Sequence, residues 1–454
     1  MDARKYMEEL VGKSRAAQIE FENFTQEQVD AIVKAIGRVV YDHAEELAKM
    51  AVEETGMGVY EHKVAKNKGK SKTIWNSLKG KKSVGIIGRD PENGIVEVAK
   101  PMGVVGAVTP TTNPIVTPMC NSMFAIKGRN SIIIAPHPRA KKCSTYTVQL
   151  INEAIKKYNA PQNLIQVIEE PSIEKTNLLM NAVDVVVATG GMGMVKAAYS
   201  SGKPSYGVGA GNVQVVVDRE MDFDDVATKI ITGRTFDNGI ICSGEQTVIA
   251  HEDDYDGLIE AFKKNGAYYV NDPKEKEAFR NTIFIDGVIN KDVVGQSPQK
   301  VAELAGINIG EDVKVILIEA DGIGHEDVLC KEKMCPVMAT FKCKTFEEGI
   351  HIAQTNLNLE GKGHSAAIHS NNQEHIDYAG LNLTVSRLVV NQPSSTTAGG
   401  SFFNGFAPTT TLGCGSWGNN SISENFTYKH MMNISRIGHY VCDRVVPTDE
   451  ELWA

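Results

Sequence analysis

The runs Val104-Val105-Gly106-Ala107-Val108 and Ile132-Ile133-Ile134-Ala135 decide the fold of this chain. Both are apolar without alternation, as expected of strands that are covered on both faces of a sheet. Similar runs occupy residues 164–168, 185–188 and 213–217, and helical periodicity fills the intervals near 143–158, 172–182 and 193–200. Strands that alternate with helices in this way predict an α/β protein with a parallel, doubly wound sheet.

A second series of alternating elements begins after about residue 240. Its strand candidates are 247–250, 314–318, 337–341, 366–368 and 388–390. Because 454 residues exceed what one hydrophobic core usually holds, we predict two α/β domains, over 1–238 and 239–424. The polar, irregular stretch 391–424 is expected to be functional or to lie at an interface.

Two local signals lie near the N-terminus. Thr25 and Gln28 form a capping box, with Phe24 and Val29 as a hydrophobic staple, so a helix should begin there. Residues 83–101 read SVGIIGR, DPENG and IVEVAKP, two β-rich runs around a turn, and predict a hairpin.

Composition excludes several classes of function. The net charge is −9, which disfavours a nucleic-acid binder. Neither a signal peptide nor an apolar run long enough to span a bilayer is present, so no membrane role is expected. The eight cysteines form no CxxC pair and indicate a reducing, cytoplasmic setting. His364 and His369 lack the context of metal ligands, so no metal site is expected.

One cysteine has an unusual context. Cys242 lies in Phe236-Asp237-Asn238-Gly239-Ile240-Ile241-Cys242-Ser243-Gly244-Glu245-Gln246, between a glycine-containing turn and a strand-like run. Substrate can reach a loop thiol at a domain junction, and oriented backbone N–H groups can surround it. The context alone leaves two interpretations open, a nucleophile and a small core residue.

Three further segments follow predicted strands, where open α/β sheets bind ligands. Asn113 lies in Thr109-Pro110-Thr111-Thr112-Asn113-Pro114 and could donate to an oxyanion, or form an ordinary Asn-Pro turn. Thr189-Gly190-Gly191 precedes a helix and could approach a phosphate, although it lacks the GxGxxG fingerprint. The cations of the segment 136–142 could neutralise phosphates or form a solvated charge run.

Taken in order, these pieces resemble the aldehyde dehydrogenase superfamily over essentially the full length. Five motifs are similar to those of its CoA-acylating branch, and most closely to those of bacterial succinate-semialdehyde dehydrogenases of that branch. They are PTTNP (110–114), APHPRAKK (135–142), FDNGIICSGEQ (236–246), CKEKMCP (330–336) and GCGSWGNNSISEN (413–425). The resemblance implies a Rossmann-type cofactor domain, an α/β catalytic domain and a small β oligomerisation flap. The hairpin 83–101 and the segment 425–454 would form that flap and build a homodimer or a dimer of dimers.

The resemblance also implies roles for individual residues. Cys242 would be the nucleophile, and Asn113, with the backbone N–H of Cys242, would form the oxyanion hole. The cofactor, NADP or NAD, would contact the following residues: Thr111, Thr112, Pro136, His137, Arg139, Thr189, Gly190, Gly191, Gly209 and Glu332.

Two departures from the hydrolytic members bear on mechanism. Val208 stands where those enzymes carry a water-activating glutamate, so the acyl group on Cys242 should pass to the CoA thiolate rather than to water. Pro138, beside Arg139, stands where many of them place a glutamate against the adenosine ribose, which makes NADP acceptable.

We therefore expect a ping-pong enzyme, with CoA as co-substrate, that interconverts succinyl-CoA and succinate semialdehyde. The substrate carboxylate would meet Ser243, Arg387, Ser394 or Thr396, although Arg387 could equally form a structural salt bridge. A propionaldehyde or acetaldehyde enzyme of the same branch is one alternative. A hydrolytic aldehyde dehydrogenase, a cysteine acyltransferase or hydrolase without redox chemistry, and a binding protein are the others.

Overall fold

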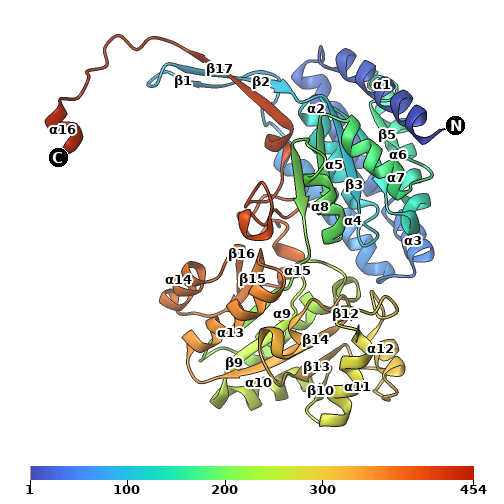
Figure 1. Cartoon of the computed structure of the whole chain (residues 1–454), viewed down its shortest axis with the longest axis vertical. Coiled ribbons are helices and arrows are strands. Elements are labelled where there is room, and N and C mark those ends of the chain that lie inside the picture. The colour runs from blue at the N-terminus through green and yellow to red at the C-terminus, as the bar shows by residue number, and fades with distance from the viewer. Residues whose placement is uncertain (1) are drawn as a thin grey trace.

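The computed structural model describes residues 2–454, which form two α/β bodies and a projecting flap (Figure 1). The first body surrounds a five-stranded sheet and the second a seven-stranded sheet; both sheets are wholly parallel. This confirms the predicted α/β class with parallel sheets.

The first body has the sheet order β5-β4-β3-β6-β7. Its strands are β3 (Val104–Thr109), β4 (Ser131–Pro136), β5 (Ile165–Val167), β6 (Val185–Thr189) and β7 (Ser205–Val208). The chain winds outward from β3 in one direction through β4 and β5, then returns to add β6 and β7 on the other side. A crevice for ligands is therefore expected at the carboxyl ends of β3 and β6, where the winding reverses.

Helices cover both faces of this sheet. One face packs against α1 (Ala3–Phe21), α7 (Ile173–Ala182) and α8 (Met192–Tyr199). The other packs against α2 (Gln26–Asp42), α3 (Ala44–Thr55), α4 (Tyr60–Leu78), α5 (Val116–Lys127) and α6 (Lys141–Lys156). The capping box that was predicted at Thr25 and Gln28 is present at the start of α2.

The second body has the sheet order β10-β13-β14-β9-β8-β15-β16. Its strands are β8 (Gln214–Val217), β9 (Thr247–His251), β10 (Ala267–Val270), β13 (Val315–Glu319), β14 (Val337–Cys343), β15 (Gly363–His369) and β16 (Val385–Val390). One face is covered by α9 (Phe223–Thr235) and α10 (Glu252–Lys264), the other by α11 (Pro273–Ile283), α12 (Pro298–Leu304), α13 (Phe346–Leu359) and α14 (Gln373–Asn382). A two-stranded hairpin, β11 (Phe284–Ile285) and β12 (Val288–Ile289), follows α11.

The strand β8 corrects one sequence expectation. The run 213–217 was assigned to the first sheet, but β8 pairs with β9 and β15 at the centre of the second. The division between the sheets therefore falls between Val208 and Gln214, not at residue 238. The reason is that an apolar strand has the same sequence signature in either sheet, and only pairing selects its neighbours.

The flap is an antiparallel sheet of β1 (Gly85–Asp90), β2 (Ile95–Pro101) and β17 (Met432–Gly438), in the order β1-β2-β17. It projects from the first body, and the chain beyond it runs outward as an arm that ends in α16 (Asp449–Trp453) (Figure 1). The predicted hairpin over 83–101 is thus β1 and β2. The irregular segment 391–424 holds one short helix, α15 (Ser394–Thr397), and passes between the two bodies (Figure 1).

Candidate functional site

The carboxyl edge of the five-stranded sheet gathers the segments that the sequence singled out. Asn113 follows β3, the segment 136–142 begins at the end of β4, Thr189 ends β6, and Gly209 follows β7. These four strands are neighbours in the order β4-β3-β6-β7. Their loops therefore lie at one edge of the first body.

The Cys242 loop comes from the second body, between α9 and β9. Asp237 and Asn238 adopt left-handed backbone angles, with φ of 55° and 53°, and so turn the chain sharply ahead of Cys242. Gly211 packs directly beneath the loop, since a Cβ there would lie 1.8 Å from the Cys242 carbonyl oxygen. Only glycine fits at this approach of two backbones.

Cys242 and Asn113 line a single cavity of about 380 Å³. Ser243, Thr396, Lys66 and Lys70 share its wall with Phe236, Phe402 and Phe403. Among the described residues, no aspartate, glutamate or histidine lines this cavity. The wall therefore has no carboxylate or imidazole that could activate a water molecule against an acyl group on Cys242.

The surroundings of Cys242 keep its thiol protonated. Burial, reinforced by the nearby Glu332 carboxyl, raises the pKa of Cys242 to about 12. Burial and the neighbouring Glu360 raise the pKa of Glu332 itself to about 8. Since the thiolate is the nucleophile, a reaction at Cys242 needs a group that accepts the proton of the thiol.

Two of the four predicted substrate residues lie outside the cavity. Arg387 is buried and donates to the Ser365 hydroxyl, the Asn425 side chain and the carbonyls of His364 and Gly413. Within residues 2–454 it forms no salt bridge, and all four of these acceptors are uncharged. Ser394 is also buried, and its backbone N–H donates to Glu245.

Several residues at this site had not been predicted. Lys66 and Lys70 lie one turn apart on α4, and both line the cavity. Lys66 Nζ donates to Asn113 Oδ1 (2.7 Å) and to Asp237 Oδ2 (2.6 Å), whereas Lys70 Nζ donates to the Gly399 carbonyl (2.7 Å). Lysines on a helix usually indicate a solvated face. The sequence around Lys66 and Lys70 therefore gave no indication that these two side chains line a cavity.

His364 also lies close to the nucleophile. A Cβ at Gly211 would lie 3.4 Å from His364 Cε1, so the ring and the Cys242 backbone pack on the same glycine. The ring is fully buried, and its Nε2 has no hydrogen-bond partner in the structure. Burial, with Arg387 nearby, lowers the pKa of His364 to about 3.

The predicted phosphate turn fits a nucleotide. Side chains at Gly190, Gly191 and Gly193 would meet no atom within 4 Å, so open space lies in front of the turn. No side chain caps the first turn of α8, whose N-cap is Gly191. Free backbone donors at a helix N-terminus, located where the winding of the sheet reverses, suit a pyrophosphate.

The segment 136–142 has a partner that the sequence did not reveal. Glu54, at the end of α3, accepts hydrogen bonds from the backbone N–H groups of Lys142 (2.8 Å) and Cys143 (2.7 Å). This carboxylate satisfies the first turn of α6. Arg139 remains exposed, and His137 caps the short turn that precedes α6.

Comparisons with known proteins agree with this arrangement. A model described as the aldehyde dehydrogenase family matches residues 2–431. The chain belongs to this family. It is 60% identical over 447 residues to the succinate-semialdehyde dehydrogenase (acetylating) of Clostridium kluyveri, with 98% of each chain covered.

Two solved structures of similar proteins hold ligands. A propionaldehyde dehydrogenase of Rhodopseudomonas palustris, with bound CoA and an acylated cysteine, has a TM-score of 0.86 and 32% identity, over 95% of this chain and 97% of that one. An engineered glycolyl-CoA reductase with bound NADP+ has a TM-score of 0.86 and 31% identity, over 95% and 96%.

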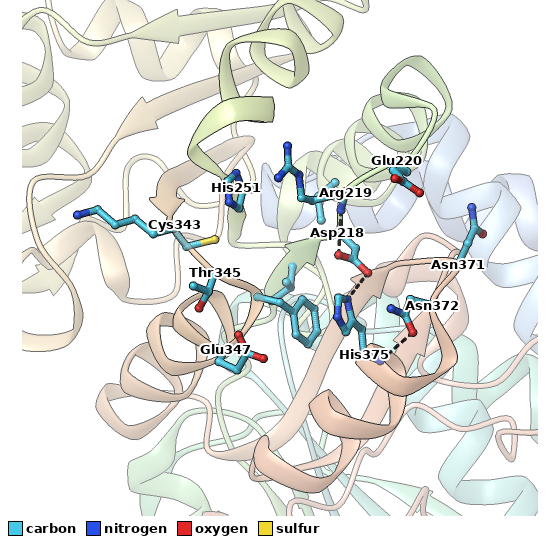
Figure 2. A pocket seen from close by; sticks show the side chains of 14 residues that line it. Asp218, Arg219, Glu220, His251, Cys343, Thr345, Glu347, Asn371, Asn372 and His375 are labelled. Atoms are coloured by element: carbon cyan, nitrogen blue, oxygen red, sulfur yellow. Dashed lines mark hydrogen bonds and ion pairs between the residues drawn. The ribbon is translucent and has the colours of Figure 1, made fainter.

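A second cavity, of about 590 Å³, lies at the carboxyl edge of the seven-stranded sheet (Figure 2). Cys242 of this aldehyde dehydrogenase precedes β9 and so lies at the amino edge of the same sheet. Asp218 accepts from the Ser370 hydroxyl (2.6 Å) and pairs with His375 Nδ1 (2.7 Å), and Arg219 Nε donates to Asp254 (3.0 Å). These charged groups satisfy one another, so we assign no chemistry to this cavity.

The described residues hold neither a candidate metal site nor a helix that could span a membrane. Over 2–454, no cluster of three or more histidine, cysteine, aspartate or glutamate side chains is arranged to hold a metal ion. No helix in the same range has the length and apolar character needed to cross a membrane.

Proposed function

We propose that this protein is a CoA-acylating aldehyde dehydrogenase that interconverts succinyl-CoA and succinate semialdehyde through a thioester on Cys242, with NADP or NAD as the hydride carrier. The observation that carries the proposal is the shared cavity of Cys242, Asn113 and Lys70, which holds a thiol, an amide donor and a cation but no carboxylate. The Clostridium kluyveri relative, at 60% identity, supports the substrate.

In the reducing direction, the Cys242 sulfur attacks the thioester carbonyl of succinyl-CoA. Asn113 Nδ2 and the backbone N–H of Cys242 donate to the oxyanion that develops, and CoA leaves as the thiol, with the proton that the Cys242 thiol has given up. A nicotinamide bound beside Cys242 would supply a hydride, which with a proton from solvent would convert the acyl-enzyme to a thiohemiacetal. Its collapse releases succinate semialdehyde and restores the thiol.

The cofactor would lie along the carboxyl edge of the first sheet. Gly190 and Gly191 would face its pyrophosphate, with Thr111, Thr112 and Gly209 beside it. Pro136, His137 and Arg139 would lie near the adenosine, and Glu332, which is close enough to Cys242 to shift its pKa, would bind the nicotinamide ribose. The exposed Arg139 is available to a 2′-phosphate, which supports the use of NADP.

Lys70 is the cation that we assign to the distal carboxylate of the substrate. Arg387 is fully engaged elsewhere, and Lys66 is held by Asp237 and Asn113. Among residues 2–454, the side chain of Lys70 makes one hydrogen bond, to the Gly399 carbonyl. Ser243 and Thr396, which line the same cavity, supply hydroxyl groups. A carboxylate would strengthen this site through a charge-assisted hydrogen bond.

The absence of a carboxylate or imidazole from the cavity wall determines which nucleophile removes the acyl group from Cys242. Val208 ends β7 with its side chain buried, and it does not line the cavity. Without a carboxylate or imidazole on the wall, water attack on the thioester is slow, so the CoA thiolate is the nucleophile that the site favours.

A CoA-dependence assay tests the proposal. Formation of NADPH or NADH from succinate semialdehyde should require CoA and should disappear in Cys242→Ala. Rapid cofactor reduction without CoA would instead identify a hydrolytic aldehyde dehydrogenase. Faster turnover of propionaldehyde than of succinate semialdehyde would leave the chemistry intact but overturn the substrate.

We further propose that the flap assembles a homodimer or a dimer of dimers. The arm beyond β17 exposes Tyr440, Val446 and Trp453, whose side chains are 83–90% exposed in the single chain. Apolar groups on an extended arm indicate a surface that another chain covers. All eight cysteines are free, which supports work in a reducing compartment such as the cytoplasm.

A further inference from the structure

Behind Asn113, a buried ion cluster joins three segments of the chain that are far apart in sequence. Lys66 Nζ, from α4, lies 2.7 Å from Asn113 Oδ1 and 2.6 Å from Asp237 Oδ2. Asn113 belongs to the turn after β3, and Asp237 belongs to the turn that leads to Cys242. One ammonium group therefore connects the proposed oxyanion donor with the nucleophile loop.

The chemistry of this contact fixes which way the Asn113 side chain faces. An ammonium group only donates hydrogen bonds, whereas a carboxamide has one accepting end and one donating end. The end that faces Lys66 must therefore be the oxygen, which leaves Nδ2 free to face the cavity. The opposite orientation would set an NH2 group against the ammonium and present an acceptor to a developing oxyanion.

Asp237 holds Lys66 in place. Its carboxylate is fully buried and also accepts from Lys63 Nζ (3.0 Å) and the Val59 backbone N–H (2.9 Å). Burial opposes the ionisation of Asp237, but Lys66 and Lys63 hold its pKa below the ordinary value. A side chain at Gly58 would approach Asp237 Oδ1 to 2.0 Å, so backbone closes that side of the carboxylate.

We propose that Lys66, anchored by Asp237, is a positioning residue for the oxyanion hole: it locks the Asn113 carboxamide with Nδ2 toward the adduct on Cys242. Two lysines around one carboxylate leave the cluster with a positive charge, which polarises the amide and strengthens Nδ2 as a donor. The inference rests on the proposed thioester chemistry at Cys242. A merely structural Lys66 would tie α4 to the loop without acting through Asn113.

A double-mutant cycle on the full chain tests this role, with p-nitrophenyl acetate as the acyl probe and the initial burst of nitrophenolate as the rate of acylation. Because loss of one oxyanion donor costs about 100- to 1,000-fold, Asn113→Ala should slow the burst by that order. Lys66→Met should slow it by about 10-fold or more, yet by less than about 3-fold when Asn113 is already alanine. Lys66→Arg should recover most of the rate.

Lys68→Met is the matched control, because Lys68 lies on the same helix and pairs with Glu45 on the surface. It should leave the burst unchanged. Alkylation of Cys242 by iodoacetamide creates no oxyanion, so its rate should change by less than about 3-fold in Lys66→Met. If Lys66→Met fails to fold, Lys66→Gln, which keeps a neutral donor, should show the same dependence on Asn113.

An equal loss of acylation in the wild-type and Asn113→Ala backgrounds would overturn the proposal, as would an unchanged burst in Lys66→Met. Failure of the proposed function would look different. A wild-type enzyme that acylates with the ester but reduces cofactor without CoA would refute the CoA-dependent activity and leave the role of Lys66 intact.

Discussion

Lys70→Met gives the sharpest test of substrate recognition. The change removes the cavity cation that we assign to the distal carboxylate while keeping the length of an unbranched side chain. A hydrogen bond between charged groups contributes about 1.5–3 kcal/mol, which corresponds to roughly 10- to 150-fold in kcat/KM. The loss should therefore be of that order for succinate semialdehyde.

The comparison substrate is butyraldehyde, which has four carbons but no carboxylate. Its kcat/KM should change by less than about 3-fold, because the terminal methyl group of butyraldehyde has no charge-dependent interaction with the Lys70 ammonium. Both aldehydes are assayed with saturating CoA and cofactor. Lys72→Met, which removes another lysine from the cavity wall, is the matched control and should preserve the ratio of the two substrates.

The pH dependence supplies a second readout. Burial lowers the pKa of Lys70 to about 8, so the ammonium is present below that pH and is lost above it. Since kcat/KM reports groups of the free enzyme, the preference for succinate semialdehyde over butyraldehyde should hold below pH 8 and decline above it. An equal effect of Lys70→Met on the two aldehydes, or a preference that rises with pH, would refute the assignment.

Three further changes have expected outcomes. Gly211→Ala should lower the acylation rate of Cys242 more than 10-fold, since the new Cβ would collide with the Cys242 carbonyl oxygen; alkylation kinetics that match the wild type would contradict this. Thr25→Ala removes the capping box of α2 and should lower the free energy of unfolding by about 1 kcal/mol in the first urea transition, with no effect on activity. Truncation after Gly438 should reduce the assembly size measured by light scattering; an unchanged mass would exclude the arm from the interface.

Much of the architecture could be predicted from the sequence because it depends on local patterns. The buried strands β3 and β4 are continuous apolar runs, and α2 begins at a capping box. The edge strands β7 (SYGV) and β10 (AYYV) were missed because neither contains the run of valines or isoleucines that marks β3, β4 and β8. The sheet membership of β8 depends on pairing over long distances in sequence, which no local pattern records.

The candidate site divides in the same way. Asn113 and Cys242 could be singled out because proline and glycine mark their turns. Lys66, Lys70 and Asp237 could not, since their roles arise only when α4 packs against loops from both bodies. Arg387 is the opposite case. The sequence made it a candidate for binding the substrate carboxylate, but in the structure its guanidinium donates to a hydroxyl, a side-chain amide and two backbone carbonyls.

The irregular segment 391–424 allows the substrate specificity of such an enzyme to change separately from its chemistry. It brings Gly399, Phe402 and Phe403 to the cavity, whereas the nucleophile and the oxyanion donor come from loops attached to the two sheets. Phe403, 93% exposed, is free of tight packing. Gly399 and Gly400 must stay glycine, because a Cβ at either would lie within 3 Å of neighbouring atoms. Exchange of residues 401–403 alone would therefore remodel the length and polarity of the acyl chamber and leave Cys242 and Asn113 in place, so new aldehyde specificities are open to substitutions in one surface-accessible stretch.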